Sequence, residues 1–285
     1  MLFPFSKGMF MLACSETLPV LDVVDLRKSF GTKGKEGKLA VNGVSFSIMP
    51  GECVGLVGES GSGKSTVANM VLRLLDASGG TIEFMGEDIT HVRGKGLRKV
   101  YGNLQAVFQN PVGSFDPRRT LRYGIMEGMR NDGLSKEEAS RRADELAKQC
   151  GLPLEVLDRH PREVSGGQCQ RCAIARAIAG SPSLLVCDEA TSALDVTIQR
   201  QIVELIDRIR HESGMAVLFI SHDIALVSDI CDRVVVMKGG RVIEQGPTRR
   251  VIDNPSTEYV RELLSSSELC PNKEELSCLL YTSPS

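Results

Sequence analysis

Residues Gly58 to Ser65 form the most complete chemical motif in the sequence. They read Gly-Glu-Ser-Gly-Ser-Gly-Lys-Ser and match the phosphate-loop pattern GxxxxGK(S/T), between an apolar strand at Val54 to Val57 and a helix expected at Thr66 to Leu75. Backbone N–H groups of such a loop point inward at a β-phosphate, and the helix N-terminus adds the positive end of its dipole. Lys64 is expected to bridge the β- and γ-phosphates of a nucleotide, and Ser65 to bind Mg²⁺. The nucleotide-binding residues predicted from this motif are Gly58, Glu59, Ser60, Gly61, Ser62, Gly63, Lys64, Ser65 and Thr66.

Two acidic residues, Asp188 and Glu189, follow the apolar run Leu184 to Cys187. A single acid after a buried strand can simply cap the next element. Beside a phosphate loop a second interpretation is favoured, in which Asp188 holds Mg²⁺ through water and Glu189 orients and deprotonates the attacking water. The pair therefore predicts nucleotide hydrolysis.

A second anion-binding surface is predicted at Ser165 to Gln168, which read Ser-Gly-Gly-Gln before an apolar helix. In isolation these residues fit a flexible turn with a serine N-cap. One predicted helix separates them from Asp188, and their helix N-terminus offers a hydroxyl and free N–H groups to an anion. One compact domain does not easily fold both anion sites onto one nucleotide, so a second copy of the chain is expected to supply the other site.

The chain around these motifs alternates between strand and helix patterns. β-branched runs punctuated by glycine predict strands at residues 21–30, 39–48, 52–58 and 80–89. Residues 117–163 are charged and rich in alanine, and they predict a mainly helical insertion with a helix at Lys136 to Cys150 and a shorter helical piece near Leu154. After it, helices at 167–179, 198–211 and 224–230 alternate with strands at 184–187, 216–221 and 234–237. This alternation predicts a parallel sheet with crossover helices.

The composition argues against several classes of protein. The 285 residues hold 34 Lys and Arg against 36 Asp and Glu, and no basic block is long enough to follow a phosphate backbone, so no nucleic-acid partner is expected. Nine scattered cysteines are typical of free thiols in a reducing compartment, which predicts a cytosolic protein. No run reaches the about 18 apolar residues of a spanning helix, so a membrane role is expected to depend on a partner.

Both ends of the chain differ in pattern from the region between them. Residues 1–18 are expected to be an N-terminal tail rather than an export signal, because Ser6, Lys7 and Gly8 interrupt their apolar core. Residues 267–285 are expected to be a disordered C-terminal tail. One domain is predicted between the tails, at residues 19–266.

From Pro19 to Ser265 the sequence resembles the ATP-binding subunit of an ABC transporter. The resemblance rests on the phosphate loop, the signature at Ser165 to Gln168 and the two acids, in that order. It implies an α/β fold: a P-loop NTPase core with a mainly parallel sheet, an antiparallel β subdomain, and a helical insertion subdomain at about residues 111–165. It also implies a dimer that binds two ATP molecules with Mg²⁺.

The resemblance assigns further roles to single residues. It implies that Phe30 stacks on adenine, that Gln109 senses Mg²⁺ and the γ-phosphate, and that His222 is the switch histidine on the γ-phosphate. Ser192 to Asp195 match the loop that crosses the dimer. Taken singly, Phe30 also fits a core residue, and Gln109 or His222 a surface residue. The implied catalytic residues are Glu189, His222 and Gln109, the metal ligands Ser65, Gln109 and Asp188, and the further nucleotide contacts Phe30, Ser165, Gly166, Gly167, Gln168 and Asp195.

Two features depart from the family pattern. Val164 stands where the signature usually begins with leucine, which is a conservative apolar change. Cys169 stands where a basic residue is common, and with Cys172 it forms Cys-x-x-Cys. A second ligand pair is missing, so thiols packed on a helix face are expected rather than zinc or redox chemistry.

Within the family, the segment Phe108 to Arg118 and the ending Gly246 to Leu264 resemble importers of oligopeptides, dipeptides and nickel. Thr257 to Val260 differ from the His-Pro-Tyr-Thr usual there, so peptide and metal transport both stay open. The sequence thus predicts an ATP-hydrolysing subunit on the cytoplasmic face of a bacterial membrane. The expected partners are transmembrane permease subunits, a second ATP-binding subunit and, indirectly, an extracytoplasmic solute-binding protein.

Two other functions compete with this prediction. A soluble ABC ATPase of DNA repair or translation usually carries two ATPase domains or coiled-coil arms, and the sequence shows neither. A signalling GTPase needs a base-reading motif of the Asn-Lys-x-Asp type, which the sequence does not contain, and it would leave the signature unexplained.

Overall fold

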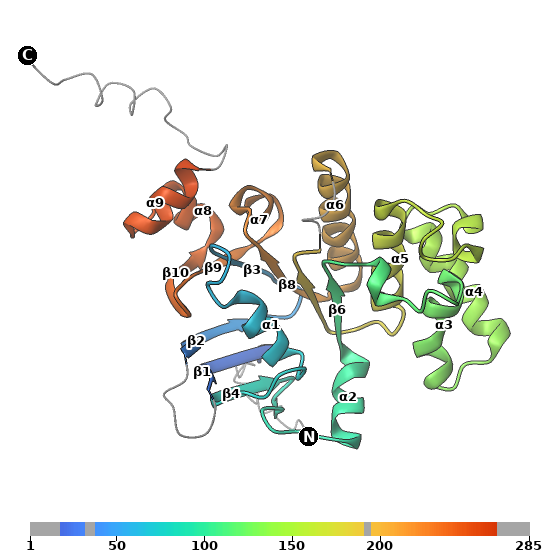
Figure 1. Ribbon diagram of the computed structural model, residues 1–285, viewed down its shortest axis with the longest axis horizontal. Helices are drawn as coiled ribbons and strands as arrows, with labels where there is room; N and C mark the ends of the chain where they lie inside the picture. Colours follow the sequence, from blue (N-terminus) through green and yellow to red (C-terminus); the bar gives the residue numbers. More distant parts are fainter. Residues whose placement is uncertain (1–17, 32–37, 191–194, 267–285) are drawn as a thin grey trace, which may run out of the picture.

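A six-stranded sheet forms the centre of the molecule (Figure 1). The computed structural model describes residues 18–31, 38–190 and 195–266. Within them the strand order of this sheet is β10-β9-β3-β8-β7-β6, and every neighbouring pair is parallel except β10 and β9. The strands are β3 (Cys53–Val57), β6 (Leu104–Phe108), β7 (Leu184–Asp188), β8 (Ala216–Ser221), β9 (Arg233–Lys238) and β10 (Arg241–Pro247).

A second, four-stranded sheet is antiparallel and has the order β2-β1-β4-β5. Its strands are β1 (Leu21–Phe30), β2 (Lys38–Ile48), β4 (Gly79–Phe84) and β5 (Glu87–Asp88). Leu21 pairs with both Ile48 and Phe84, so β1 lies between β2 and β4. The predicted α/β fold, with a mainly parallel sheet, an antiparallel β part and helices, is confirmed.

The helices cover both faces of the six-stranded sheet (Figure 1). In β3, Cys53 and Val57 belong to one buried cluster and Val54 and Leu56 to the other, because successive side chains of a strand point to opposite faces. The helices that flank the central strands are α1 (Lys64–Val71), α2 (Lys95–Asn103), α5 (Gly166–Ile178), α6 (Val196–Ser213) and α7 (Ile224–Ile230).

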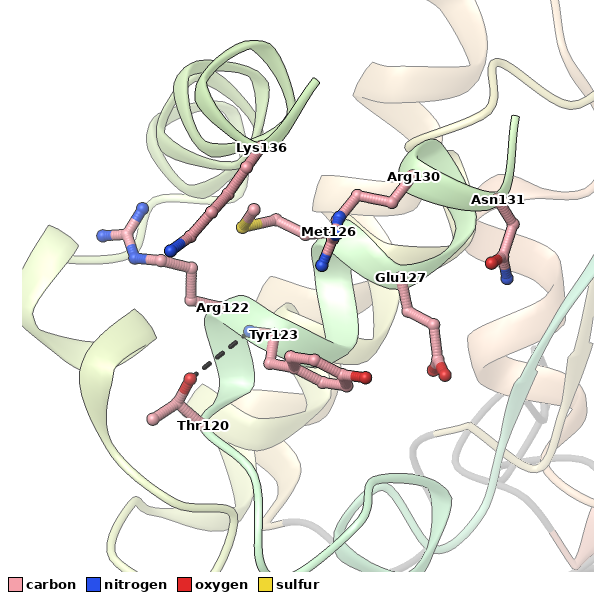
Figure 2. A pocket seen from close by; sticks show the side chains of 8 residues that line it. All are labelled: Thr120, Arg122, Tyr123, Met126, Glu127, Arg130, Asn131 and Lys136. Carbon is pink, nitrogen blue, oxygen red and sulfur yellow. Dashed lines mark hydrogen bonds between the residues drawn. The ribbon is translucent and has the colours of Figure 1, made fainter. Parts of the chain in front are cut away.

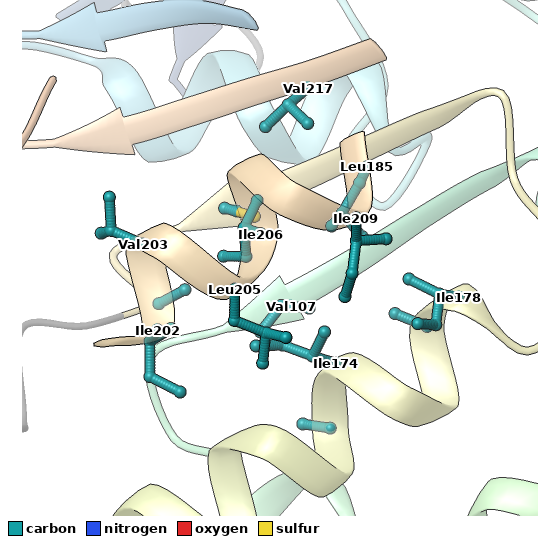
Figure 3. Packing of buried hydrophobic residues seen from close by; sticks show 14 of the residues in the cluster. Val107, Ile174, Ile178, Leu185, Ile202, Val203, Leu205, Ile206, Ile209 and Val217 are labelled. Atoms are coloured by element: carbon teal, nitrogen blue, oxygen red, sulfur yellow. The ribbon is translucent and has the colours of Figure 1, made fainter. Parts of the chain in front are cut away.

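Figure 3 shows the face of the sheet that α5 and α6 cover. Ile174 of α5 and Ile206 of α6 lie against Val107, Leu185 and Val217 of three neighbouring strands. Each fully buried isoleucine or leucine stabilises the fold by about 1.5–3 kcal/mol. This packing fixes the direction in which α5 and α6 present their N-termini.

The helix α1 differs from its prediction at both ends. It begins at Lys64 rather than Thr66 and ends at Val71 rather than Leu75. Val67 and Met70 are buried as the periodicity predicts, but Leu74 is 59% exposed. The helix stops early because Arg73 has a φ of 55°, a left-handed conformation that an α-helix does not continue through.

A group of helices lies beyond β6, at the opposite end of the molecule from α8 and α9 (Figure 1). It contains the short η1 (Val112–Ser114), α3 (Leu121–Asn131), α4 (Lys136–Gln149) and η2 (Leu154–Asp158), and it packs on α5. The helix at α4 was predicted, whereas α3 was not. The chain ends its described part in α8 (Thr248–Asp253) and α9 (Glu258–Ser265).

Several expectations lie outside the described residues. They concern the tails at residues 1–17 and 267–285, and residues 192–194 of the dimer-crossing loop. The domain limits at residues 19 and 266, and the limits of the helical insertion at about 111 and 165, stay predictions.

Candidate functional site

Four predicted site residues directly follow the carboxyl ends of four neighbouring strands. Val57 pairs with Ser221, while Ile220 and Phe108 both pair with Asp188. The residues one step beyond these strands are Gly58, His222, Glu189 and Gln109. They therefore line one edge of the sheet, and in open α/β sheets ligands bind outside the carboxyl ends of the strands.

The phosphate loop between β3 and α1 has a shape that requires glycine. A Cβ on Gly58 would lie 2.1 Å from the carbonyl oxygen of Met237, and one on Gly63, where φ is 106°, would lie 2.5 Å from that of Ala40. Around Gly61, with φ of 78°, no atom lies within 4 Å of such a Cβ. The loop is thus packed tightly against the protein on one side and open on the other, as a cradle for phosphate needs to be.

Lys64 occupies the inside of this loop. Its side chain is 4% exposed, and Nζ donates hydrogen bonds to the carbonyl oxygens of Gly58 at 2.7 Å and Glu59 at 2.9 Å. Burial lowers the pKa of the Lys64 ammonium, while the carboxylates of Glu189, Asp188 and Glu59 raise it. The loop therefore holds a largely desolvated cation, which attracts a phosphate oxygen more strongly than an exposed lysine does.

Ser65 and Asp188 meet beside Lys64. Ser65 Oγ donates a hydrogen bond to Asp188 Oδ1 at 3.2 Å. Burial raises the pKa of the Asp188 carboxyl, and the repulsion from Glu189 adds to this, whereas the Ser65 hydrogen bond and Lys64 lower it. A nearby divalent cation would relieve that burial cost.

These two oxygens fit a magnesium ion. Mg²⁺ prefers oxygen ligands and is commonly held by one or two protein groups together with substrate phosphates and water. Within the described residues no three His, Cys, Asp or Glu side chains gather as a metal site. The hydroxyl and carboxylate beside the phosphate loop match the sparser magnesium arrangement.

Glu189 and His222 lie together at the sheet edge. Glu189 Oε1 is 3.7 Å from His222 Nδ1, and the side chains are 25% and 57% exposed. Glu189 has a φ of 48°, and its backbone N–H donates to the carbonyl oxygen of Ile220 at 3.1 Å. This left-handed conformation costs about 1–3 kcal/mol in a residue other than glycine. The strand β7 ends directly before it, at Asp188.

The segment that follows Gln109 is held to α5 at Ser114 and Phe115. Gln109 is exposed and follows Phe108, the strand partner of Asp188. The guanidinium of Arg176 donates to the carbonyl oxygen of Ser114 and, at 2.9 Å, to its hydroxyl, and it stacks 4.2 Å from the centroid of Phe115. Burial lowers the pKa of Arg176. The sequence analysis did not identify Arg176. Arg176 and Ser114 are 62 positions apart, and no motif around either residue predicts their contact.

The signature residues Ser165 to Gln168 form the N-terminus of α5 and are not part of the phosphate site. Ser165 Oγ accepts from the Gln168 N–H at 3.2 Å, and Gln168 Oε1 accepts from the Ser165 N–H at 3.0 Å, which makes a reciprocal capping box. Ser165 and Gly166 are exposed. In the described part of the chain, none of these hydrogen bonds reaches the phosphate loop.

Asp195 lies next to the signature. Its carboxylate caps α6 by accepting from the Ile198 N–H at 3.0 Å. A Cβ on Gly167 would lie 2.9 Å from Ile198 Cγ2, so this glycine lets the two helix N-termini approach each other. The arrangement leaves a polar surface on the outside of the molecule.

Phe30 lies at the end of β1, in the other sheet. Its side chain is 52% exposed, and Lys28 Nζ lies 5.3 Å from the ring centroid. The exposure is unusual for a core phenylalanine and leaves ring surface for a planar group to stack on.

Cys169 and Cys172 are buried, free thiols. Burial raises the pKa of Cys169 to about 11 and that of Cys172 to about 12. The reactive thiolate is therefore scarce at neutral pH. The prediction of packed thiols on a helix is confirmed.

A separate cavity of about 410 Å³ lies between α3 and the start of α4 (Figure 2). Arg122, Glu127, Arg130 and Lys136 line it, and Arg122 is held by ion pairs with Asp144 at 2.6 Å and Asp158 at 2.8 Å. None of the predicted site residues lines this cavity. The candidate site is the open sheet edge instead.

Comparison with known proteins agrees with this geometry. Residues 41–192 match the family model described as ABC transporter. The chain belongs to the ABC transporter family. The sequence-based resemblance is thus confirmed.

Two relatives illustrate the family membership. The glutathione import ATP-binding protein GsiA of Salmonella typhimurium is 45% identical over 228 residues, which cover 80% of this chain and 37% of that protein. This chain therefore matches little more than a third of GsiA. A second relative is the Brucella abortus protein BAB2_0818, whose name describes it as a peptide import ATP-binding protein. It is 42% identical over 249 residues, which cover 87% of this chain and 78% of the relative.

Two solved structures share the fold. That of cbiO1 from Clostridium perfringens, part of the ABC transporter complex cbiONQ, has a TM-score of 0.75 at 29% identity and covers 92% of this chain and 98% of that chain. A dimeric post-hydrolysis structure of the ATP-binding cassette MJ0796, bound to ADP and Pi, has a TM-score of 0.74 at 29% identity and covers 80% of this chain and 99% of the other. No helix in the described ranges has the length and apolar content to cross a bilayer.

Proposed function

We propose that this chain binds and hydrolyses ATP as the energising subunit of a peptide importer. The observation that carries the proposal is the row of Gly58, His222, Glu189 and Gln109 at the ends of four adjacent strands, next to the buried Lys64. The names of the relatives support peptide import, since glutathione is itself a small peptide. They give no support to nickel import or to a role in DNA repair or translation.

The phosphate loop and its neighbours bind the triphosphate. Lys64 exchanges its bonds to the loop carbonyls for phosphate oxygens, while N–H groups at the start of α1 point at the same anion. Ser65, Asp188 and Gln109 would hold Mg²⁺, which would neutralise phosphate charge. Phe30 stacks on the adenine.

Glu189 acts as the general base and His222 as its neighbour on the γ-phosphate. Glu189 follows Asp188 at the sheet edge, and its carboxylate is partly buried. It can therefore orient a water molecule and accept its proton. His222 lies close enough to Glu189 to fix its direction. Hydrolysis then ends in ADP and phosphate.

A second ATP-binding subunit completes each site. The exposed Ser165 and Gly166 at the start of α5 bind the ATP held by the partner, and Asp195 lies on the side of the chain that faces the partner. Because the closed dimer binds ATP more tightly than the open one, ATP binding closes the pair and hydrolysis reopens it. The dimeric structure of MJ0796 supports this assembly.

The conformational change driven by ATP is transmitted to transmembrane permease subunits through Gln109 and the segment at Ser114 and Phe115, which Arg176 contacts. An extracytoplasmic solute-binding protein delivers the peptide to the permease. The chain lies at the cytoplasmic face of the membrane, and the bacterial relatives support that place.

Phosphate release and uptake assays test the proposal. The purified chain should hydrolyse ATP with Mg²⁺ and lose this activity in EDTA. Co-purified with its permease subunits and reconstituted into liposomes, it should drive uptake of a labelled di- or tripeptide when ATP is supplied on the side of this chain. ATP-dependent uptake of nickel but not of peptide would contradict the proposed substrate, and an absence of hydrolysis in the complete complex would contradict the proposed activity.

A further inference from the structure

A tyrosine near the end of the described chain contacts the phosphate loop. Tyr259 Oη accepts a hydrogen bond from the backbone N–H of Glu59 at 3.2 Å, across 200 positions of sequence. Tyr259 belongs to α9 and is 6% exposed, so the contact is built into the packing. The sequence motif of the phosphate loop contains no sign of it.

The ring of Tyr259 is itself held in place. Lys238 Nζ lies 4.1 Å from the ring centroid, and Lys238 follows Met237, the residue whose carbonyl oxygen closely approaches Gly58. Burial raises the pKa of the Tyr259 phenol, and the charges of Glu59 and Glu262 raise it further, while the hydrogen bond from the Glu59 N–H lowers it by less, so the net shift is upward. The phenol therefore stays neutral at physiological pH and keeps its hydroxyl.

The phosphate loop needs an external tie at this point. Gly58, Gly61 and Gly63 all have positive φ, and loops rich in glycine lose much entropy when they are ordered. Other contacts also hold the loop, among them Lys64 Nζ from inside and the N–H of Gly240, which donates to the Ser62 carbonyl oxygen at 2.9 Å. Lys64 has to release the Glu59 carbonyl when it turns to a phosphate, whereas Tyr259 can keep its bond to Glu59.

We propose that Tyr259 is a positioning residue that preorders the phosphate loop for nucleotide and thereby sets ATP affinity from α9. The proposal rests on the proposed function for its ligand, ATP. A loop that is already ordered loses less entropy when ligand binds, so its affinity is higher. Tyr259 touches no reacting atom, so its effect falls on binding and not on the chemical step.

The test is Tyr259→Phe, which removes one oxygen and keeps the ring beneath Lys238. The matched control is Tyr123→Phe on α3, where the ring also carries a cation, Arg119 at 4.8 Å, but the hydroxyl is remote from the loop. Two measurements are made on each full-length variant: hydrogen exchange of residues 58–63 without nucleotide, and ATP titration followed by steady-state kinetics.

We expect Tyr259→Phe to speed exchange at Glu59 and to raise both the ATP dissociation constant and KM about two- to tenfold, with kcat unchanged. Tyr123→Phe should change none of these quantities. Equal ATP affinity in Tyr259→Phe and the wild type would overturn the inference and leave the proposed function standing. A fall in kcat with unchanged KM would also overturn it, because that split indicates a role in the chemical step. If the wild type itself binds no ATP, it is the proposed function that fails.

Discussion

The hydroxyl of Ser65 donates to the carboxylate of Asp188 across 123 positions of sequence, at 3.2 Å. This bond joins the first turn of α1 to the end of β7, two strands away from β3. A carboxylate so placed is held beside the Lys64 ammonium even though burial disfavours its charge. The cost has a functional reason if a divalent cation binds there.

Asp188→Asn should separate stability from metal binding. The pKa of Asp188 in the folded chain is raised above its ordinary value of 3.8. The stability that Asp188 contributes is therefore fully present below pH 3.8 and is lost as the pH rises through the pKa of the folded chain. Asparagine does not titrate. We therefore expect the metal-free variant to melt at a higher temperature than the wild type at pH 7, with the difference shrinking toward pH 4.

The same variant should lose the response to magnesium. Mg²⁺ with ATP should raise the melting temperature of the wild type far more than that of Asp188→Asn, since an amide oxygen is a weaker ligand than a carboxylate. Scanning calorimetry in EDTA and in Mg²⁺ measures both effects. A lower melting temperature for the metal-free variant at pH 7 would show that the carboxylate stabilises the empty site, contrary to the pKa argument.

Glu189→Gln should keep ATP binding and nearly stop turnover. The amide preserves the shape of the side chain but cannot accept a proton from water, and general base catalysis contributes about 10²- to 10⁴-fold. We expect kcat to fall by that factor and an ATP-bound dimer to accumulate. Size-exclusion chromatography with ATP, together with phosphate release, checks the result; unchanged hydrolysis without any dimer would sink the assignment of Glu189.

The sequence carries the information for the candidate site at the sheet edge, because each part of that site is encoded by neighbouring residues. The phosphate loop needs glycine at Gly58 and Gly63, where a Cβ would strike a backbone oxygen. Asp188 and His222 each follow an apolar strand, and strand alternation alone predicts that these ends lie side by side. The strand register places these two ends on the same edge of the sheet.

What the sequence does not reveal is set by contacts between distant segments. Arg176 binds Ser114 and Tyr259 binds Glu59 without any periodic pattern that would pair them. The strand β6, which precedes Gln109, has only five residues with Gln105 among them, so periodicity alone cannot distinguish it from helix. The early end of α1 depends on the φ of Arg73, which no propensity predicts for arginine.

Gln170 offers a prediction about stability. Its side chain is 1% exposed, and neither Nε2 nor Oε1 has a hydrogen-bond partner. A buried polar group without a partner costs about 1–3 kcal/mol, so Gln170→Leu should raise the free energy of unfolding by about 1 kcal/mol or more. Urea denaturation measures this change.

Gln168→Leu, two residues earlier on α5, is the matched control. It removes the side-chain oxygen that accepts from the Ser165 N–H, so it should lower the free energy of unfolding by about 1 kcal/mol. Opposite signs for the same substitution would identify the orphaned amide as the cause. A loss of stability in Gln170→Leu would mean that its amide is satisfied after all, by a bound water for example.

Ser165→Arg should leave ATP binding by a single chain intact while it abolishes dimer formation and hydrolysis. Ser165 lies at the exposed N-terminus of α5. Its hydrogen bond with Gln168 does not reach the phosphate loop of the same chain. A long cation there adds to the positive end of the helix dipole and fills the space in which the partner's phosphate would sit. Fluorescent-ATP titration and analytical ultracentrifugation with ATP measure the two effects separately.

Mixing two inactive variants tests whether the site is shared between chains. Lys64→Ala removes the buried ammonium and should weaken ATP binding, whereas its signature is intact. Combined with Ser165→Arg, it can assemble one composite site from the phosphate loop of one chain and the signature of the other. We expect the mixture to recover part of the wild-type ATPase rate, although neither variant hydrolyses ATP alone. If Ser165→Arg by itself works at the wild-type rate in the assembled transporter, then the capping box is only a helix cap and each chain hydrolyses ATP without help from its partner.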